Sequence, residues 1–243
     1  MTKDPDRPPP ANPLAPGPRS RPASYPGSRP AFDYLLRGDR VHPLPDDRAL
    51  LLSGRRAVVA FGSNAAPAQL AAKFGPTAAA IPVTRARLHG FCVGHSPHVS
   101  VPGYVPWVLV DAPGSVVDVA VLWLDEAQRA RLDVTEPNYD LVPVDAARYS
   151  LVVEAVEVGF GYAAYRGRWG ALRWPGEHRP APAASQVELF TGLGRLGWFR
   201  ELVGPGGLVE RQRRLAADPG LRDRVRDELA ARAMVVPDGW ATG

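Results

Sequence analysis

The stretch Val58-Val59-Ala60-Phe61-Gly62-Ser63-Asn64 is an apolar run that stops at a Gly-Ser-Asn turn. A short apolar run rich in β-branched residues and bounded by a turn is typical of a buried strand, and we predict one over residues 57–61. Gly62 can adopt backbone angles that other residues avoid, and the N–H groups of such a turn can form a concavity that binds an anion. A plain connection from strand to helix uses the same residues, so both interpretations stay open for this motif alone.

A second motif, Leu132-Asp133-Val134-Thr135-Glu136, places one carboxylate just after a predicted short helix. Asp125 caps that helix with Gln128 three positions on, and Pro137 prevents its continuation. A glutamate after a helix is usually solvated, whereas a partly buried one can transfer protons near neutral pH. Together the two motifs suggest an acid–base enzyme whose substrate carries its own carboxylate.

The rest of the chain predicts an α+β fold. Strand-like runs at 85–93, 107–110, 116–124, 139–144 and 149–158 are separated by Pro and Gly. Most of them are too close in sequence for long crossovers, which favours a small mixed or antiparallel sheet closing towards a β-barrel. Leu221, Val225 and Leu229 then lie at helical spacing after Asp218-Pro219, as expected of a capped helix packed on the body.

Four segments are predicted along the chain. Residues 1–30 contain ten prolines and few large apolar side chains, so we expect a disordered tail. Residues 31–54 form a lead-in, and residues 55–160 form the main domain. Residues 161–243 begin as an irregular Gly-, Pro- and Arg-rich stretch and continue as a helical extension that packs on the domain.

Composition excludes several classes of protein. The net charge of +4 is diffuse, and the arginines of the N-terminal tail are interpreted as solvated rather than as a nucleic-acid-binding arm. No apolar run approaches the roughly 20 residues that a membrane span needs, and a cytoplasmic location is the default expectation. Cys92 is the one cysteine, so no internal disulfide or multi-cysteine metal site is expected.

Three further motifs fail for lack of structural context. Gly192-Leu193-Gly194-Arg195-Leu196-Gly197 matches a dinucleotide fingerprint by letters, but no alternating strands and helices surround it. Ser96 lacks the second glycine and the strand–turn–helix setting of a nucleophile elbow. His95 and His98 flank a proline and have no third ligand nearby, so we expect no metal there.

The order and spacing of the two main motifs resemble the gamma-glutamylcyclotransferase-like superfamily over residues 55–158. Its Tyr-Gly-Ser-Asn loop is similar to Phe61-Gly62-Ser63-Asn64, and its Leu-Asp-x-x-Glu segment to Leu132-Asp133-Val134-Thr135-Glu136, followed by Tyr139. Arg87-Leu88-His89-Gly90-Phe91 is similar to the family's second strand. Two positions depart from the family: Phe61 replaces a tyrosine, and Pro137 replaces a glycine.

The resemblance implies conversion of a gamma-glutamyl amide into 5-oxoproline and a free amine, with no cofactor or metal. It implies Glu136 as the catalytic acid–base and substrate binding by Phe61, Gly62, Ser63, Asn64 and Tyr139. The alternative is a non-catalytic binding or scaffold module that retains the fold. A buried Glu136 that faces the 62–64 turn across a pocket would favour the enzyme, and an exposed or ion-paired Glu136 would favour the binding module.

Overall fold

The computed structural model describes residues 12–76, 78–154, 156–157 and 161–240. The strands are β1 (Asn12–Pro13), β2 (Tyr34–Arg37), β3 (Arg40–Pro43), β4 (Arg56–Ala60), β5 (Ile81–His95), β6 (Trp107–Leu124), β7 (Tyr139–Pro143), β8 (Leu151–Val153), β9 (Val156–Glu157), β10 (Tyr162–Gly167), β11 (Ala171–Leu172) and β12 (Val235–Val236). The helices are α1 (Ala49–Leu52), α2 (Pro67–Phe74), α3 (Glu126–Val134), α4 (Gln186–Arg195), α5 (Gly197–Val203), α6 (Leu208–Ala217) and α7 (Pro219–Ala231), with 3₁₀ turns η1 (Pro22–Ser24) and η2 (Ser63–Ala65).

The main sheet is mixed. Its described strands run in the order β1-β3-β2-β5-β6-β4-β10-β7, and β8 and β9 extend it from β5. β4 and β10 pair in parallel, whereas the neighbours of both are antiparallel. The α+β class is therefore confirmed. Among the described strands no pairing joins β1 to β7, so the predicted closure into a barrel is not seen.

β5 and β6 form the longest ladder of the sheet. We predicted two separate strands at 107–110 and 116–124, but β6 is continuous through Pro113 and Gly114. The ladder shifts register between His89 and Phe91. Gly90 lies at this bulge with φ of 82°, and a Cβ there would approach the Tyr149 ring to 2.8 Å. The bulge therefore needs glycine and re-aims the end of β5 towards the helices.

β4 is buried on both faces, as predicted. Ala57 and Val59 contact one core cluster, which includes Phe91 and Tyr149. Val58 and Ala60 contact a second cluster under α2 and α3. A strand enclosed in this way holds the turn that follows it in a fixed position.

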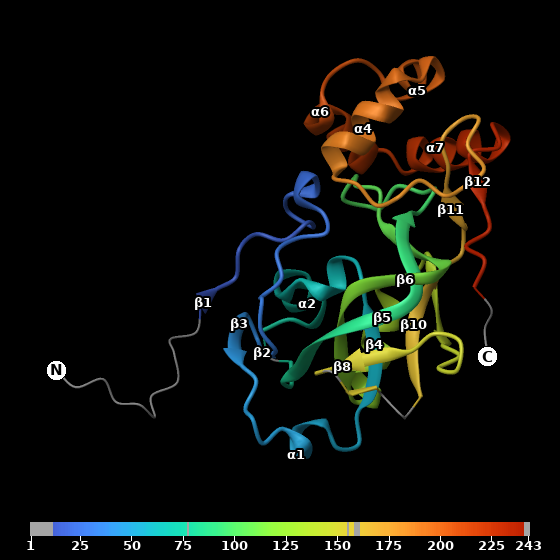
Figure 1. Cartoon of the computed structure of the whole chain (residues 1–243). Coiled ribbons are helices and arrows are strands. Elements are labelled where there is room, and N and C mark those ends of the chain that lie inside the picture. Colours follow the sequence, from blue (N-terminus) through green and yellow to red (C-terminus); the bar gives the residue numbers. More distant parts are fainter. Residues whose placement is uncertain (1–11, 77, 155, 158–160, 241–243) are drawn as a thin grey trace.

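The C-terminal helices form a separate layer. Figure 1 shows α4–α7 together at one end of the molecule, beyond the ends of β5 and β6. Their apolar side chains form one cluster with Val99 and Val105 from the β5–β6 loop. Asp218 caps α7 as predicted, and Leu221, Val225 and Leu229 are buried. No helix among the described residues is both long and apolar enough to cross a membrane.

Two predicted boundaries need correction. Residues 1–11 of the expected disordered tail lie outside the described residues, but residues 14–30 lie on the body, with Tyr25 only 5% exposed. Aromatic packing holds this segment in spite of its prolines, since Tyr25 stacks on Tyr104. The domain also continues beyond residue 160, because β10 pairs with both β4 and β7.

Candidate active site

The 62–64 turn begins directly after β4. Gly62 precedes η2, whose residues Ser63 and Asn64 lead into α2. The carbonyls of Gly62 and Ser63 accept the N–H groups of Ala65 and Ala66. This turn borders a cavity of about 420 Å³. All six site residues predicted from the sequence line that cavity: Phe61, Gly62, Ser63, Asn64, Glu136 and Tyr139.

Glu136 reaches the cavity through a tight turn after α3. Asp125 and Gln128 form the predicted capping box at the start of this helix. At its end, Thr135 Oγ1 donates to the Leu132 carbonyl at 2.7 Å, and the Glu136 N–H donates to the Asp133 carbonyl at 3.0 Å. The Asp133 carboxylate accepts the Tyr165 hydroxyl at 2.6 Å, which joins α3 to β10. The second motif therefore aims Glu136 and ties its helix to the sheet.

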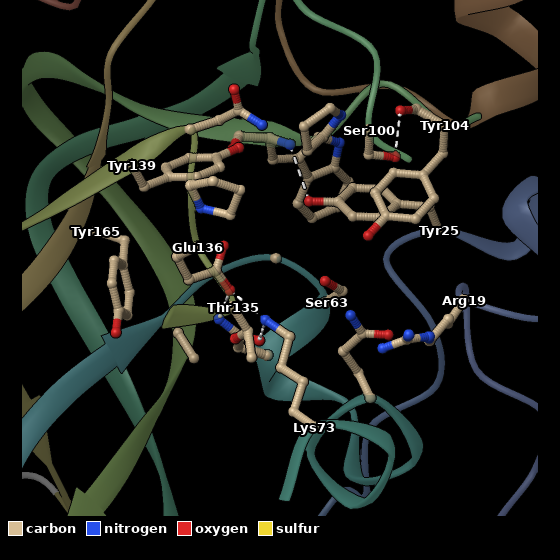
Figure 2. Close-up of a pocket in the computed structure, with 18 of the residues that line it drawn as sticks. Arg19, Tyr25, Ser63, Lys73, Ser100, Tyr104, Thr135, Glu136, Tyr139 and Tyr165 are labelled. Carbon is tan, nitrogen blue, oxygen red and sulfur yellow. Dashed lines mark hydrogen bonds and ion pairs between the residues drawn. The ribbon is translucent and has the colours of Figure 1, made fainter. Parts of the chain in front are cut away.

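Glu136 faces the 62–64 turn and is ion-paired. Its Oε1 accepts a hydrogen bond from Asn64 Nδ2 at 2.8 Å and another from Lys73 Nζ. Lys73 Nζ also donates to Asn64 Oδ1 at 2.8 Å, so the three side chains form a closed triangle (Figure 2). The Lys73 and Glu136 side chains are 7% and 14% exposed. The arrangement thus meets in part the criterion for the enzyme, since the facing glutamate is partly buried, and it meets the criterion for the binding module, an ion pair.

Oε2 of Glu136 accepts no hydrogen bond from a described residue, since both donors bind Oε1. A carboxylate oriented through one oxygen keeps the other for proton transfer. Glu136 is therefore positioned by Lys73 and Asn64 through Oε1, and Oε2 is not engaged by either of them.

Tyrosines form much of the cavity wall, and most of their hydroxyls are engaged. Tyr139 donates to the Trp107 carbonyl at 2.9 Å. Burial raises the pKa of the Tyr139 hydroxyl well above its ordinary value, and nearby Tyr25 and Glu136 raise it further. Burial raises the pKa of the Tyr104 hydroxyl too, and the nearby Ser63 side chain lowers that pKa in part. These phenols stay protonated at neutral pH and do not compete with Glu136 for protons.

The N-terminal segment contributes Arg19 and Tyr25 to the same cavity. Tyr25 Oη accepts the Trp107 N–H at 2.8 Å, and its ring lies edge-on to the Trp107 ring at 5.6 Å. Arg19 is exposed and pairs with no carboxylate of the described residues, in contrast to Lys73. Figure 2 shows Arg19 and Tyr25 on the side of the cavity opposite Glu136.

Sequence reasoning missed Lys73, Tyr25 and Arg19. Lys73 carried a weak signal, because it follows Leu70 by three positions and so shares the buried face of α2. The sequence around Tyr25 and Arg19 contains no signal for a place at the cavity, since both lie among prolines and the cavity is formed by residues far along the chain.

The three motifs that lacked the expected sequence context do not form the sites that their letters suggest. Gly192 and Gly194 lie within α4 rather than in a phosphate-binding turn. His98 Nδ1 lies 2.5 Å from Ser96 Oγ, and His98 borders the cavity, but Ser96 is fully buried. Burial, together with the charge of Arg226, lowers the pKa of His98 to about 3. Within the described part of the chain, no three His, Cys, Asp or Glu side chains gather as a metal ion requires.

Comparison with known proteins found structural matches alone. No family model and no curated protein matches the sequence. Two Arabidopsis thaliana proteins solved in solution are 20% and 18% identical, with TM-scores of 0.37 and 0.36; both matches cover 61% of this chain, and they cover 87% and 81% of the plant chains. A solved gamma-glutamyl cyclotransferase is 15% identical with a TM-score of 0.40, over 78% of this chain and 92% of that chain. The chain is similar in fold to a gamma-glutamyl cyclotransferase.

Proposed function

We propose that this protein is a gamma-glutamylcyclotransferase-like enzyme that releases an amine from a gamma-glutamyl amide and forms 5-oxoproline. The observation that carries the proposal is Glu136, which is partly buried, faces the 62–64 turn across a cavity and is oriented through one oxygen by Asn64 and Lys73. A positioned carboxylate that can move a proton suits a reaction in which the substrate's own amine is the nucleophile.

In the proposed reaction the α-amine of the substrate attacks its own side-chain carbonyl carbon. The new C–N bond closes the five-membered ring, and the bond to the leaving amine breaks. Glu136 Oε2 accepts a proton from the attacking amine and returns one to the leaving amine, so no water is consumed. The amine and the carbonyl belong to one substrate molecule, so the cavity has only to hold that molecule in the folded conformation that brings the two groups into contact.

An acidic substrate is favoured by the charges around the cavity. Lys73 is neutralised by Glu136, whereas Arg19 pairs with no described carboxylate. A guanidinium binds a carboxylate through two parallel hydrogen bonds. We therefore propose that the substrate's α-carboxylate lies towards Arg19 and its scissile amide lies towards Glu136.

The first test is release of 5-oxoproline from a panel of gamma-glutamyl amines by the wild type and by Glu136→Gln. We expect release by the wild type and loss of at least about 10²-fold in kcat for the variant, because the general acid–base is gone. Circular dichroism checks that the variant is folded. Equal release by both proteins would contradict the role of Glu136.

A binding module is the second candidate, and the Lys73–Glu136 ion pair is the observation that favours it. A carboxylate locked by a lysine and an amide can serve as a fixed hydrogen-bond acceptor instead of a proton carrier. If the protein is a binding module, calorimetry should detect binding of a gamma-glutamyl amine, and no 5-oxoproline should form from any member of the panel.

A further inference from the structure

The N-terminal segment forms a strap over the cavity. Gly17 packs on Ala68 of α2, where an added Cβ would lie 3.1 Å from the alanine methyl. The η1 turn lies against α4 and α6. Residues 14–30 therefore run from α2 to the helical layer, as Figure 1 shows for the blue segment, and Arg19 and Tyr25 of this segment line the cavity.

The strap inserts Tyr25 into the cavity wall. The ring stacks on Tyr104 with centroids 4.4 Å apart, which fixes its direction. Its hydroxyl lies so close to the 62–64 turn that a Cβ on Gly62 would be 2.5 Å from Oη. Glycine at position 62 is thus required by the approach of this phenol. Tyr25, which lies near the start of the described residues, therefore lies against the 62–64 turn on which the proposed chemistry depends.

The Tyr25 oxygen accepts one backbone hydrogen bond, from the Trp107 N–H at 2.8 Å. A phenol oxygen has one proton to donate in addition to the bonds it accepts. No described residue accepts that proton, whereas Tyr139 donates to Trp107 and Tyr165 donates to Asp133. The Tyr25 proton is left for an acceptor inside the cavity.

We propose that Tyr25 is a catalytic residue of this site and donates its hydroxyl hydrogen bond to the carbonyl oxygen of the scissile amide. The inference rests on the proposed function, because that carbonyl oxygen becomes negative when the α-amine attacks. The Trp107 N–H polarises the phenol, and the stack on Tyr104 holds the ring in place, so the hydroxyl needs little reorganisation to act. A preorganised donor aimed at a developing oxyanion is a large contribution to catalysis of acyl transfer.

The electrostatics of Tyr25 agree with a donor and not with a base. Burial raises the pKa of its hydroxyl well above the ordinary value, and Tyr104 and Glu136 raise it further, while the backbone N–H groups of Trp107 and Ser63 lower it in part. The hydroxyl therefore keeps its proton throughout the neutral range, and proton transfer stays with Glu136.

The test compares Tyr25→Phe with the wild type by kinetics. Phenylalanine keeps the stack on Tyr104 and removes only the hydroxyl. We expect kcat to fall by about 10²-fold with KM little changed, as for loss of one oxyanion donor. Tyr34→Phe is the matched control, because it removes a buried hydroxyl that donates to the Ala65 carbonyl away from this cavity, and it should leave kcat unchanged.

A second readout needs no turnover. The probe is 5-oxoproline labelled with ¹³C at its ring carbonyl, whose chemical shift moves downfield when the oxygen accepts a strong hydrogen bond. We expect that movement on binding to the wild type and to Glu136→Gln, and its loss in Tyr25→Phe. An unchanged bound shift, or kcat equal to or above that of the wild type in Tyr25→Phe, overturns the role of Tyr25 alone. Failure of the wild type both to release and to bind 5-oxoproline overturns the proposed function with it.

Discussion

At the scale of single residues, the Lys73–Glu136 pair decides how the site behaves. Both side chains are largely removed from water, and Asn64 links them through its two polar atoms. Desolvating two charges costs energy that their attraction must offset, so removal of one partner leaves a charge with no compensation. The pair therefore constrains stability as well as chemistry.

We predict that Lys73→Met lowers the free energy of unfolding by about 3 kcal/mol, as for other buried pairs that lose one partner. Addition of Glu136→Gln to this variant should cost less than the sum of the single changes, because the uncompensated carboxylate is then gone. Urea unfolding of the wild type, both single variants and the double variant measures this coupling. Glu228→Gln is the control: its exposed pair with Arg232 should be worth about 0.5 kcal/mol or less. Strict additivity would show that the pair is not coupled.

The same residues show how far sequence reasoning reaches. The 62–64 turn and Glu136 each follow a strand or helix whose ends carry local signals, and the family resemblance implied that they belong to one site. Tyr25 could not be placed at the cavity from the sequence, since its partner Trp107 is 82 positions away and prolines surround it. A proline-rich composition indicates how the segment behaves in the unfolded chain. It does not indicate which aromatic side chains of the folded protein the segment can pack against.

At the scale of elements, short strands were the hardest to predict. β4 and α3 were found because apolar runs and a capping box are local patterns. β10 was missed, although it lies between β4 and β7, because its six residues follow a glycine-rich stretch with no clean alternation. The single strand predicted at 149–158 is instead β8 and β9, with Glu154 between them at φ of 52°. Pairing partners supplied by the rest of the sheet determine these elements.

The junction between β5 and α4 predicts a pH dependence. His95 Nε2 at the end of β5 accepts the Ala184 N–H at 2.9 Å, just before the Ser185 cap of α4. Burial lowers the pKa of His95 from 6.5 to about 4. Between these values the unfolded chain binds a proton that the folded one does not, so stability is lost as pH falls from 6.5 towards 4.

We expect His95→Gln to flatten that loss by up to about 1.4 kcal/mol per pH unit, because glutamine keeps an acceptor but does not titrate. Some slope remains, since burial also lowers the pKa of His98. Urea unfolding across this range measures the slope. The exposed His178→Gln serves as the control and should not alter it. An unaltered slope in His95→Gln would refute the assignment.

At the scale of the whole molecule, the helical layer supports the cavity through the β5–β6 loop. Gln186 at the start of α4 is fully buried, and its amide accepts the Val105 N–H at 2.9 Å and donates to the Val105 carbonyl at 2.8 Å. Val105 is the neighbour of Tyr104, which stacks on Tyr25. One side-chain amide thus connects the helices to the aromatic wall of the site.

We predict that Gln186→Met lowers the free energy of unfolding by about 2 kcal/mol, because it leaves two buried backbone groups unpaired. It should also reduce kcat for 5-oxoproline release through displacement of Tyr104. Gln212→Met is the matched control in the same layer: Gln212 is equally buried, but its Nε2 has no partner among the described residues, so the loss should be smaller. Equal losses in the two variants would argue against a specific link.

The strap has a consequence for the order in which the site can form during synthesis. Arg19 and Tyr25 leave the ribosome before every strand of the main sheet except β1, but the surfaces on α4 and α6 that receive η1 are made after β10. A nascent chain that has already folded β4, η2 and α3 therefore carries Glu136 beside an unfinished pocket. The cavity is complete only when the N-terminal segment contacts the C-terminal helices. The cavity therefore forms late in biosynthesis, although Glu136 is placed early.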